Sequence, residues 1–202
     1  QVAIGYVGGT GASRFTYTYA GDMNGDGVND NDLIYVPNRA SELTFLPVTI
    51  SGTTYTAEQQ AQLWDKYIDQ DPYLSTRRGQ YAERNGGVLP WLNQYDLSFI
   101  QEFFIKVGKK EKRNTIQIRA DILNFGNFLN SNWGVGQFVN NTRPLTAAGN
   151  TTAGVPQYRL STQSIRKADG TSVTEPIQST FQYGNRVGDV WNAQLGIRYI
   201  FN

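Results

Sequence analysis

The sequence of 202 residues contains no cysteine and no histidine. Without cysteine it forms no disulfide, has no thiolate nucleophile and offers no cysteine ligand to zinc. Without histidine it lacks the commonest general base and a frequent metal ligand, which excludes hydrolysis by a serine–histidine–aspartate triad. The sequence also shows no nucleophile elbow, phosphate-binding loop or metalloprotease motif. We therefore predict that the chain is not an enzyme.

Long apolar runs and an excess of one charge are absent as well. No run approaches the 18 apolar residues of a membrane-spanning helix. The 18 basic and 17 acidic residues nearly cancel, so we expect no nucleic-acid partner. The first residues, Gln1 to Ile4, include neither an initiator methionine nor the charged start of a signal peptide, and they resemble the interior of a strand. We expect the sequence to be a piece of a longer protein.

What the sequence has instead is a β-rich composition, and its clearest pattern lies near the end. Hydrophobic residues make up only 39% of the chain, whereas aromatic residues reach 13% and there are 21 glycines. Apolar and polar residues alternate over about eleven positions from Trp191 to Phe201, with Ile200 as the exception. Soluble strands average five to six residues, whereas a tilted membrane-spanning strand needs 9–11. Aromatic residues at both ends suit the two membrane interfaces. The predicted lipid-facing residues are Trp191, Leu195, Ile197, Tyr199 and Phe201.

Three further alternating segments precede this one, and the connections between them are unequal. We expect strands near 1–19, 94–107, 114–126 and 187–201, with long loops over 20–93 and 127–186 and a short charged turn over 108–114. Loops of such length are uncommon in compact soluble domains, whereas outer-membrane barrels combine long extracellular loops with short periplasmic turns. The sequence therefore predicts an all-β, antiparallel segment of a transmembrane β-barrel whose C-terminus is periplasmic. A soluble β-sandwich with two large insertions stays open as the alternative, because alternating strands are common.

In a barrel, the polar face of these strands would line the lumen. Charged residues recur at alternate positions of the second, third and fourth segments, opposite the apolar ones. The predicted lumen-facing residues are Asp96, Glu102, Lys106, Arg119, Asp121 and Arg198.

The sharpest local motif is the acidic, glycine-containing stretch Asp22–Asp32. Its oxygen-bearing side chains at positions one, three, five and nine, with glycine at position six, follow the start of an EF-hand-like calcium loop. Position twelve is Leu33, and the last acid stands one residue early. A metal-free turn is the alternative, because aspartate, asparagine and glycine form turns unaided. We predict a structural calcium ion held by Asp22, Asn24, Asp26, Val28, Asp30 and Asp32.

The first long loop contains one helix signal. Thr56-Ala57-Glu58-Gln59 is a capping-box pattern, and apolar residues follow at roughly helical spacing. Asp71-Pro72 ends the pattern. We expect an amphipathic helix of about fourteen residues whose apolar face is packed.

Several segments together resemble one receptor family. They are Phe15-Thr16-Tyr17-Thr18-Tyr19, Gly21–Gly27, Asn31-Asp32-Leu33-Ile34-Tyr35-Val36-Pro37, Arg84-Asn85-Gly86, Pro90-Trp91, Asp96-Leu97-Ser98, Ala120–Asn127 and Gln194–Phe201. The sequence resembles the C-terminal barrel region of TonB-dependent outer-membrane receptors, specifically the Oar-like receptors of the Bacteroidetes type, which carry a carboxypeptidase-like regulatory domain at the N-terminus. The acidic loop joined to Asp32-Leu33-Ile34-Tyr35-Val36-Pro37 is the most specific part of the likeness.

The resemblance implies a 22-stranded barrel with an internal plug, of which this chain would form the last four strands. It implies a place in the bacterial outer membrane, contact with membrane lipid and with the rest of the barrel and plug, and substrate import driven through TonB. The alternative function from another class is a soluble, calcium-stabilised β-rich adhesin or carbohydrate-binding module. The sequence does not indicate which substrate is imported.

Overall fold

The computed structural model describes residues 1–10, 13–107, 112–167, 169–184 and 186–201. About 48% of the chain lies in strands, which confirms the all-β prediction. Among the described residues, no helix is long and apolar enough to cross a membrane. The chain divides into two compact units: Gln1–Ala12, Pro90–Gln137 and Tyr183–Asn202 form the first, and Ser13–Leu89 with Phe138–Gln182 form the second.

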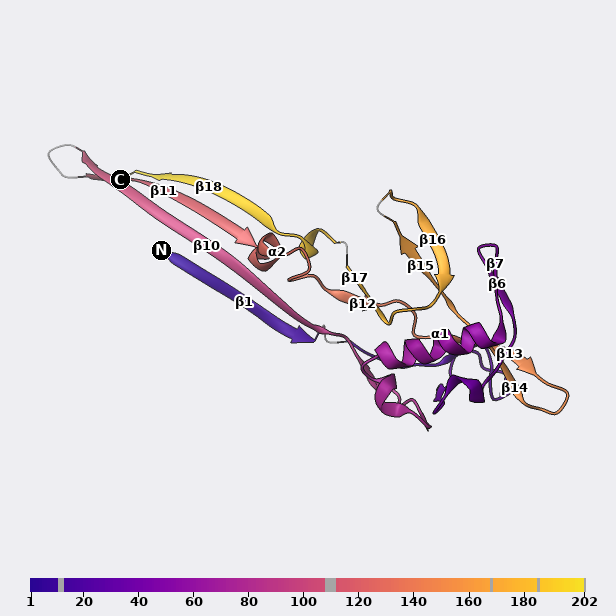
Figure 1. Ribbon diagram of the computed structural model, residues 1–202. Helices are drawn as coiled ribbons and strands as arrows, with labels where there is room; N and C mark the ends of the chain where they lie inside the picture. The colour runs from indigo at the N-terminus through magenta and orange to yellow at the C-terminus, as the bar shows by residue number, and fades with distance from the viewer. Residues whose placement is uncertain (11–12, 108–111, 168, 185, 202) are drawn as a thin grey trace. The chain divides into compact units, whose positions relative to one another are not determined.

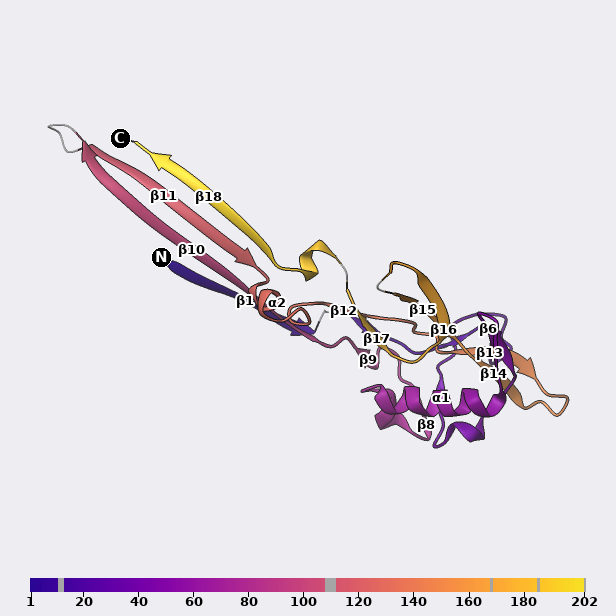
Figure 2. The ribbon, with the colours of Figure 1, turned by 45° about the horizontal axis from the view of Figure 1, so that its top comes forward.

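The first unit is built on a four-stranded antiparallel sheet. Its strands are β1 (Val2–Thr10), β10 (Trp91–Val107), β11 (Lys112–Leu123) and β18 (Asn192–Ile200), and they pair in that order. Figures 1 and 2 both show these four strands side by side. β1 and β18 are the two edges, so the sheet is open rather than closed on itself. A short helix, α2 (Phe125–Leu129), follows β11, and the 3-10 turn η3 (Val187–Asp189) precedes β18.

The strand boundaries differ from those expected from sequence. The first strand ends at Thr10 rather than near residue 19, because Tyr17 and Tyr19 are buried in the core of the second unit. The third strand ends at Leu123 rather than near 126, because Asn124 adopts a left-handed conformation with φ 52° that no strand continues. The second strand begins earlier than expected, at Trp91, and the fourth begins later, at Asn192. Of the expected turn 108–114, residues 108–111 lie outside the described residues and 112–114 belong to β11.

The second unit contains a hydrophobic core where the sequence predicted two long loops. Two stretches of the sequence, Ser13–Leu89 and Phe138–Gln182, contribute to this core. The expected loops 20–93 and 127–186 therefore largely form one packed body. Its sheets consist of strands of two to six residues, which are too short to be recognised from an alternation of apolar and polar residues. The core residues are Tyr17, Tyr19, Ile34, Val36, Ala40, Phe45, Trp64, Tyr67, Ile68, Leu74, Ala82, Leu145, Tyr158, Leu160 and Ile177.

Long-range pairing organises these short strands. The largest sheet of the unit has four strands, β3 (Tyr19–Ala20), β13 (Leu145–Asn150), β14 (Pro156–Leu160) and β5 (Thr44–Phe45), and it combines parallel and antiparallel pairs. The two-stranded sheets are β2 (Arg14–Phe15) with β9 (Gly87–Val88), β4 (Tyr35–Val36) with β8 (Gln80–Tyr81), β6 (Val48–Ile50) with β7 (Thr53–Tyr55), and β15 (Thr162–Arg166) with β16 (Ser172–Pro176). A further pair joins β12 (Gln137–Val139) and β17 (Phe181–Tyr183).

The predicted helix is present as α1, Ala57–Gln70, which has fourteen residues. Its capping box forms as expected: Gln59 N donates to Thr56 Oγ1 at 3.2 Å, and Thr56 N donates to Gln59 Oε1 at 2.9 Å. Trp64 and Tyr67 stack with ring centroids 5.3 Å apart and are fully buried. The helix therefore packs on its apolar face, as the spacing predicted. The remaining short elements are the 3-10 turns η1 (Ala40–Glu42) and η2 (Leu74–Arg77).

Candidate functional site

The register of the four-stranded sheet divides its side chains between two unlike faces. Residues directly opposite each other on antiparallel strands point to the same side. Ser98 pairs with Asp121, and Asp121 pairs with Gln194, so these three share one face, which we call the polar face. The same register places on it all the residues predicted to line a lumen: Asp96, Glu102, Lys106, Arg119, Asp121 and Arg198. That this face borders a lumen stays a prediction.

The two carboxylates at the centre of the polar face are held by separate partners. Ser98 Oγ donates to Asp121 Oδ1 at 2.6 Å, and Arg119 Nε lies 2.7 Å from Asp121 Oδ2. Gln117 Nε2 donates to Glu102 Oε1 at 2.8 Å. Two carboxylates that work as an acid–base pair need a shared substrate position between them. Here each carboxylate is instead bonded to side chains of its own sheet: Asp121 to Ser98 and Arg119, and Glu102 to Gln117. The geometry favours a polar wall, and the absence of enzymatic activity stays a prediction.

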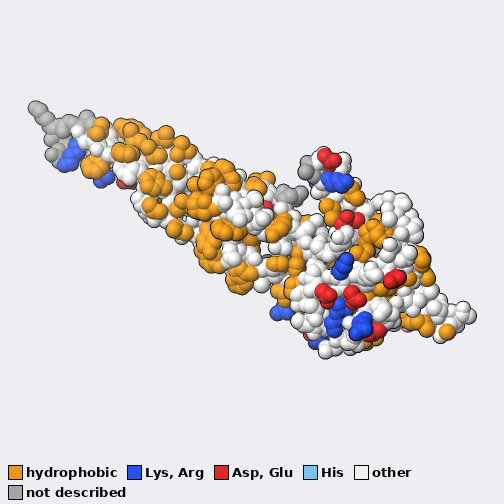
Figure 3. Space-filling model, viewed as in Figure 1, with side chains coloured by type: hydrophobic (Ala, Val, Ile, Leu, Met, Phe, Trp, Pro, Cys, Tyr) orange, Lys and Arg blue, Asp and Glu red, His pale blue; other side chains and the backbone are white. Residues whose placement is uncertain are grey.

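The opposite face, which we call the apolar face, presents large hydrophobic side chains at alternate positions. Leu195 is 71% exposed and Ile197 is 73% exposed. Figure 3 shows hydrophobic side chains gathered over the strands of this unit. Soluble monomers rarely expose a continuous apolar patch of this kind. The face also carries the polar residues Asn93, Gln101 and Asn114. Its exposed hydrophobic members include Val2, Ile4, Tyr6, Phe99, Phe103, Ile105, Ile116, Leu195, Ile197 and Tyr199.

The apolar face is long enough to cross the apolar part of a bilayer at a typical strand tilt. Trp191 and Phe201, next to the two ends of β18, are separated by ten positions in sequence. At about 3.3 Å per residue and a tilt of about 40°, ten residues rise roughly 25 Å, the height of the apolar band of outer-membrane barrels. Trp191 contacts Phe128 edge to face at 5.1 Å, and Tyr199 stacks on Phe201 at 5.9 Å. Aromatic clusters therefore stand at both ends of the band, where membrane interfaces favour them. Lipid contact by these residues stays a prediction.

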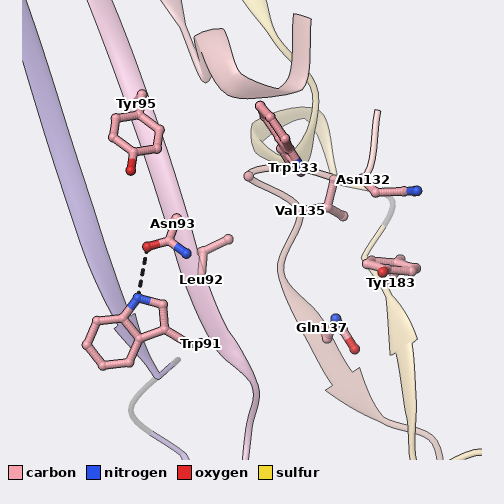
Figure 4. Close-up of a pocket in the computed structure, with 10 residues that line it drawn as sticks. Trp91, Leu92, Asn93, Tyr95, Asn132, Trp133, Val135, Gln137 and Tyr183 are labelled. Carbon is pink, nitrogen blue, oxygen red and sulfur yellow. Dashed lines mark hydrogen bonds between the residues drawn. The ribbon is translucent and has the colours of Figure 1, made fainter. Parts of the chain in front are cut away.

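Beside the first residues of β10 lies a pocket that the sequence did not reveal. It has a volume of about 430 Å³, and four of its lining residues are aromatic (Figure 4). No lining residue carries a charge. Tryptophan and tyrosine at Pro90-Trp91, Asn132-Trp133 and Tyr183 were the available signal, but nothing in the spacing brings these three segments together. The lining residues are Trp91, Leu92, Asn93, Tyr95, Asn132, Trp133, Gly134, Val135, Gln137 and Tyr183.

Hydrogen bonds hold the walls of this pocket in place. Asn93 Oδ1 accepts from Trp91 Nε1 at 3.0 Å and from Tyr6 Oη at 2.9 Å. On the other wall, Asn124 Nδ2 donates to the carbonyl of Gly134 at 3.0 Å, and Asn127 Nδ2 donates to the carbonyl of Trp133 at 3.1 Å. Asn124 and Asn127 are both buried, so their amides act as internal braces.

The predicted calcium loop is closed by its own backbone. Asp22 accepts from the N–H groups of Gly25 at 2.7 Å and Gly27 at 2.9 Å, and Asp32 Oδ2 accepts from Met23 N at 2.8 Å. Asp30 Oδ1 accepts from Gly21 N at 2.7 Å, and its other oxygen lies 3.0 Å from Arg143 Nη1. Across the described ranges, no group of three or more acidic, histidine or cysteine residues is placed to hold a metal ion.

The outer part of this loop stays exposed. Asn24, Asp26 and Val28 are all exposed. The Val28 N–H, which donates to Asp26 Oδ1 at 2.8 Å, and the Asn24 amide lower the pKa of Asp26. The loop is therefore stable as a hydrogen-bonded turn, and calcium binding by it stays a prediction.

Comparisons with models of known families, with curated proteins and with solved structures found no match to this chain.

Proposed function

We propose that the four-stranded sheet is part of the wall of an outer-membrane β-barrel, and that the chain is the C-terminal segment of an Oar-like TonB-dependent receptor. The observation that carries the proposal is the contrast between the two faces of the sheet. One face exposes Leu195 and Ile197 at alternate positions, and the other carries the paired Arg119 and Asp121. A barrel wall needs this arrangement, because one face meets lipid and the other meets the lumen.

The open edges of the sheet support membership of a larger barrel. β1 and β18 each pair on one side only within the described sheet. A sheet in lipid must close, because unpaired backbone groups cost several kcal/mol each in hydrocarbon. Further strands of the same barrel would close it, up to the 22 that the family resemblance implies, and a plug would fill the lumen.

In this proposal the protein binds a substrate with its extracellular residues and imports it, with energy supplied through TonB. The short β10–β11 connection and the C-terminus face the periplasm. The residues of the second unit belong to the extracellular loops, where a packed core gives a binding surface a fixed form. The chain contributes barrel wall and extracellular surface, while the plug and the contact with TonB come from other parts of the receptor.

A soluble, calcium-stabilised adhesin or carbohydrate-binding module is the second candidate. The hydrophobic core of the second unit favours it, because that unit buries its own apolar side chains. A soluble module would also have to cover the apolar face of the sheet, and the exposure of Ile4, Leu195 and Ile197 speaks against this.

Arginine substitutions on the two faces test the proposal. Leu195→Arg places a charge on the apolar face, at a cost of about 2–4 kcal/mol near the middle of a bilayer. Gln194→Arg places the same charge on the polar face one residue earlier. We expect outer-membrane fractions to lose the Leu195→Arg protein and to retain Gln194→Arg. Equal amounts of both in the soluble fraction, with unchanged folding, would refute the proposal and support the soluble module.

A further inference from the structure

The pocket beside β10 presents aromatic rings that nothing in the described structure covers. Trp91 is 61% exposed, Trp133 is 56% exposed and Tyr183 is 54% exposed. Figure 4 shows Trp91 on the β10 wall, with Trp133 and Tyr183 on the opposite wall. Aromatic faces exposed in a concave site bind flat, weakly polar surfaces by dispersion, and they lose little conformational entropy in doing so.

Amide groups with free hydrogen-bonding capacity lie beside these rings on both walls (Figure 4). Within the described part of the chain, the side chains of Asn132 and Gln137 make no hydrogen bond, and neither does the phenol of Tyr183. Asn93 uses its oxygen for Trp91 and Tyr6, which leaves its NH₂ group as a donor. Each free amide offers two donors and an oxygen acceptor, a set that matches hydroxyl groups.

We propose that this pocket binds a neutral saccharide. A pyranose ring has an apolar face of C–H groups and a rim of hydroxyls, so it needs aromatic planes and amides together. The pocket supplies both from Trp91, Trp133 and Asn132. Its volume of about 430 Å³ falls within the range of small-molecule sites. This proposal is independent of the proposed function, because neither saccharide binding nor the shape of the pocket requires the sheet to span a membrane.

The composition of the lining argues against charged ligands. None of the ten lining residues is acidic or basic, so a phosphate, carboxylate or ammonium group would lose its hydration without gaining a partner charge. An extended peptide is the competing occupant, because the β10–β11 register begins only at Leu97 and leaves residues 91–96 of β10 without a β11 partner. Such a peptide would bind through main-chain groups and would depend little on Asn132.

The experiment measures binding of maltohexaose, cellohexaose and xylohexaose to the full chain by calorimetry. The buffer contains an amine-oxide detergent, because maltoside or glucoside detergents would compete. A second arm uses nanodiscs with a digalactosyl lipid, which separates a lipid-linked sugar from a free one. An uncharged, strand-forming hexapeptide serves as the comparison ligand.

The variants separate the pocket from the rest of the unit. We expect Trp133→Ala to weaken saccharide binding on the order of tenfold, since a ring contact of this kind contributes about one factor of ten. Asn132→Ala removes only unpaired side-chain atoms, so its folding is preserved, and we expect it to weaken binding severalfold. Tyr199→Ala removes an exposed ring from the apolar face outside the pocket, and we expect it to leave affinity unchanged.

Saccharide binding in either arm that Trp133→Ala and Asn132→Ala reduce and Tyr199→Ala does not would support the proposal. It is overturned if none of the sugars binds, if the pocket variants bind as the parent does, or if only the hexapeptide binds. Because these results are obtained whether or not the sheet meets lipid, they are independent of the outcome of the arginine test.

Discussion

The phenol of Tyr17 donates a hydrogen bond to Asp71 Oδ2 at 2.5 Å, across 54 positions of the chain. The hydroxyl of Thr180 donates to the same oxygen, and the N–H groups of Tyr73 and Leu74 donate to the other at 2.8 and 2.6 Å. Asp71 is only 1% exposed. One buried carboxylate at the end of α1 therefore joins three distant stretches of the second unit.

Replacing Asp71 should destabilise the second unit strongly. Asp71→Asn keeps the size of the side chain but gives up an acceptor oxygen, so one or two buried donors lose their partner. We expect the free energy of unfolding to fall by about 2–4 kcal/mol, as measured by urea unfolding. Asp69→Asn is the matched control, because the Asp69 side chain is 71% exposed and pairs only with Arg78, at 2.7 Å. Its cost should stay below about 1 kcal/mol. Equal effects of the two changes would contradict this account of Asp71.

Buried tyrosines should make the second unit sensitive to high pH. Burial raises the pKa of Tyr67 from 10.0 to about 12. Burial, reinforced by Tyr67 and Asp71, raises the pKa of Tyr17, and burial beside Tyr158 raises that of Tyr19. Between pH 10 and 12 the unfolded chain loses these protons while the folded chain keeps them, so stability is full below pH 10 and falls as the pH rises.

Unfolding experiments between pH 9 and 12 check this expectation. Tyr67→Phe removes one of the linked protons, so the decline should become shallower. Tyr81→Phe, at a tyrosine that is 63% exposed, should leave the slope as in the parent. The interpretation fails if absorbance near 295 nm shows all tyrosines of the folded protein ionising together at pH 10.

The parts of the fold that sequence predicted are those with strong local signals. The alternation from Trp191 to Phe201 anticipated β18, and the Thr56–Gln59 capping box anticipated α1. Both elements are determined by interactions between residues close together in the sequence, so the local sequence is enough to predict them.

The rest of the fold depends on contacts between distant residues. The alternation of residues 15–19 suggests a strand of the large sheet. In the structure Tyr17 instead lies in the core of the second unit, where its phenol donates a hydrogen bond to Asp71. β13 pairs with β3 in parallel and with β14 in the antiparallel sense, and no periodicity in strands of two to six residues predicts such partners. The aromatic pocket was missed for the same reason, since Trp91, Trp133 and Tyr183 line one pocket only in the folded chain.

Calcium should stabilise the loop Asp22–Asp32 if the predicted site forms. We expect millimolar calcium to raise the melting temperature of the chain by a few degrees relative to a chelator. Asp22→Asn and Asp26→Asn should remove the increase. Asp169→Asn alters an exposed aspartate of a different turn and should keep it. No heat of binding in calorimetry and no shift in melting temperature would identify the loop as a metal-free turn.

A side chain at Gly134 should destabilise the wall of the aromatic pocket. Gly134 has φ +65°, and an added Cβ would collide with the Asn124 side chain that braces it. Gly25 has φ +79° with nothing near its Cβ position. We expect Gly134→Ala to cost about 2–4 kcal/mol and Gly25→Ala about 1–2 kcal/mol, from backbone strain alone. Equal losses of stability for the two variants in thermal unfolding would contradict this, because they would mean that the Asn124 side chain moves aside at little cost.

The central claim is that the apolar face meets lipid, and the absence of cysteine makes a direct measurement possible. Single cysteines at Gln194, Leu195, Ile197 and Arg198 are labelled with a fluorophore, and quenching by lipids with nitroxide-bearing acyl chains is measured for the protein in bilayers. The proposal predicts strong quenching at positions 195 and 197 and weak quenching at 194 and 198. Equal, weak quenching at all four positions would contradict it.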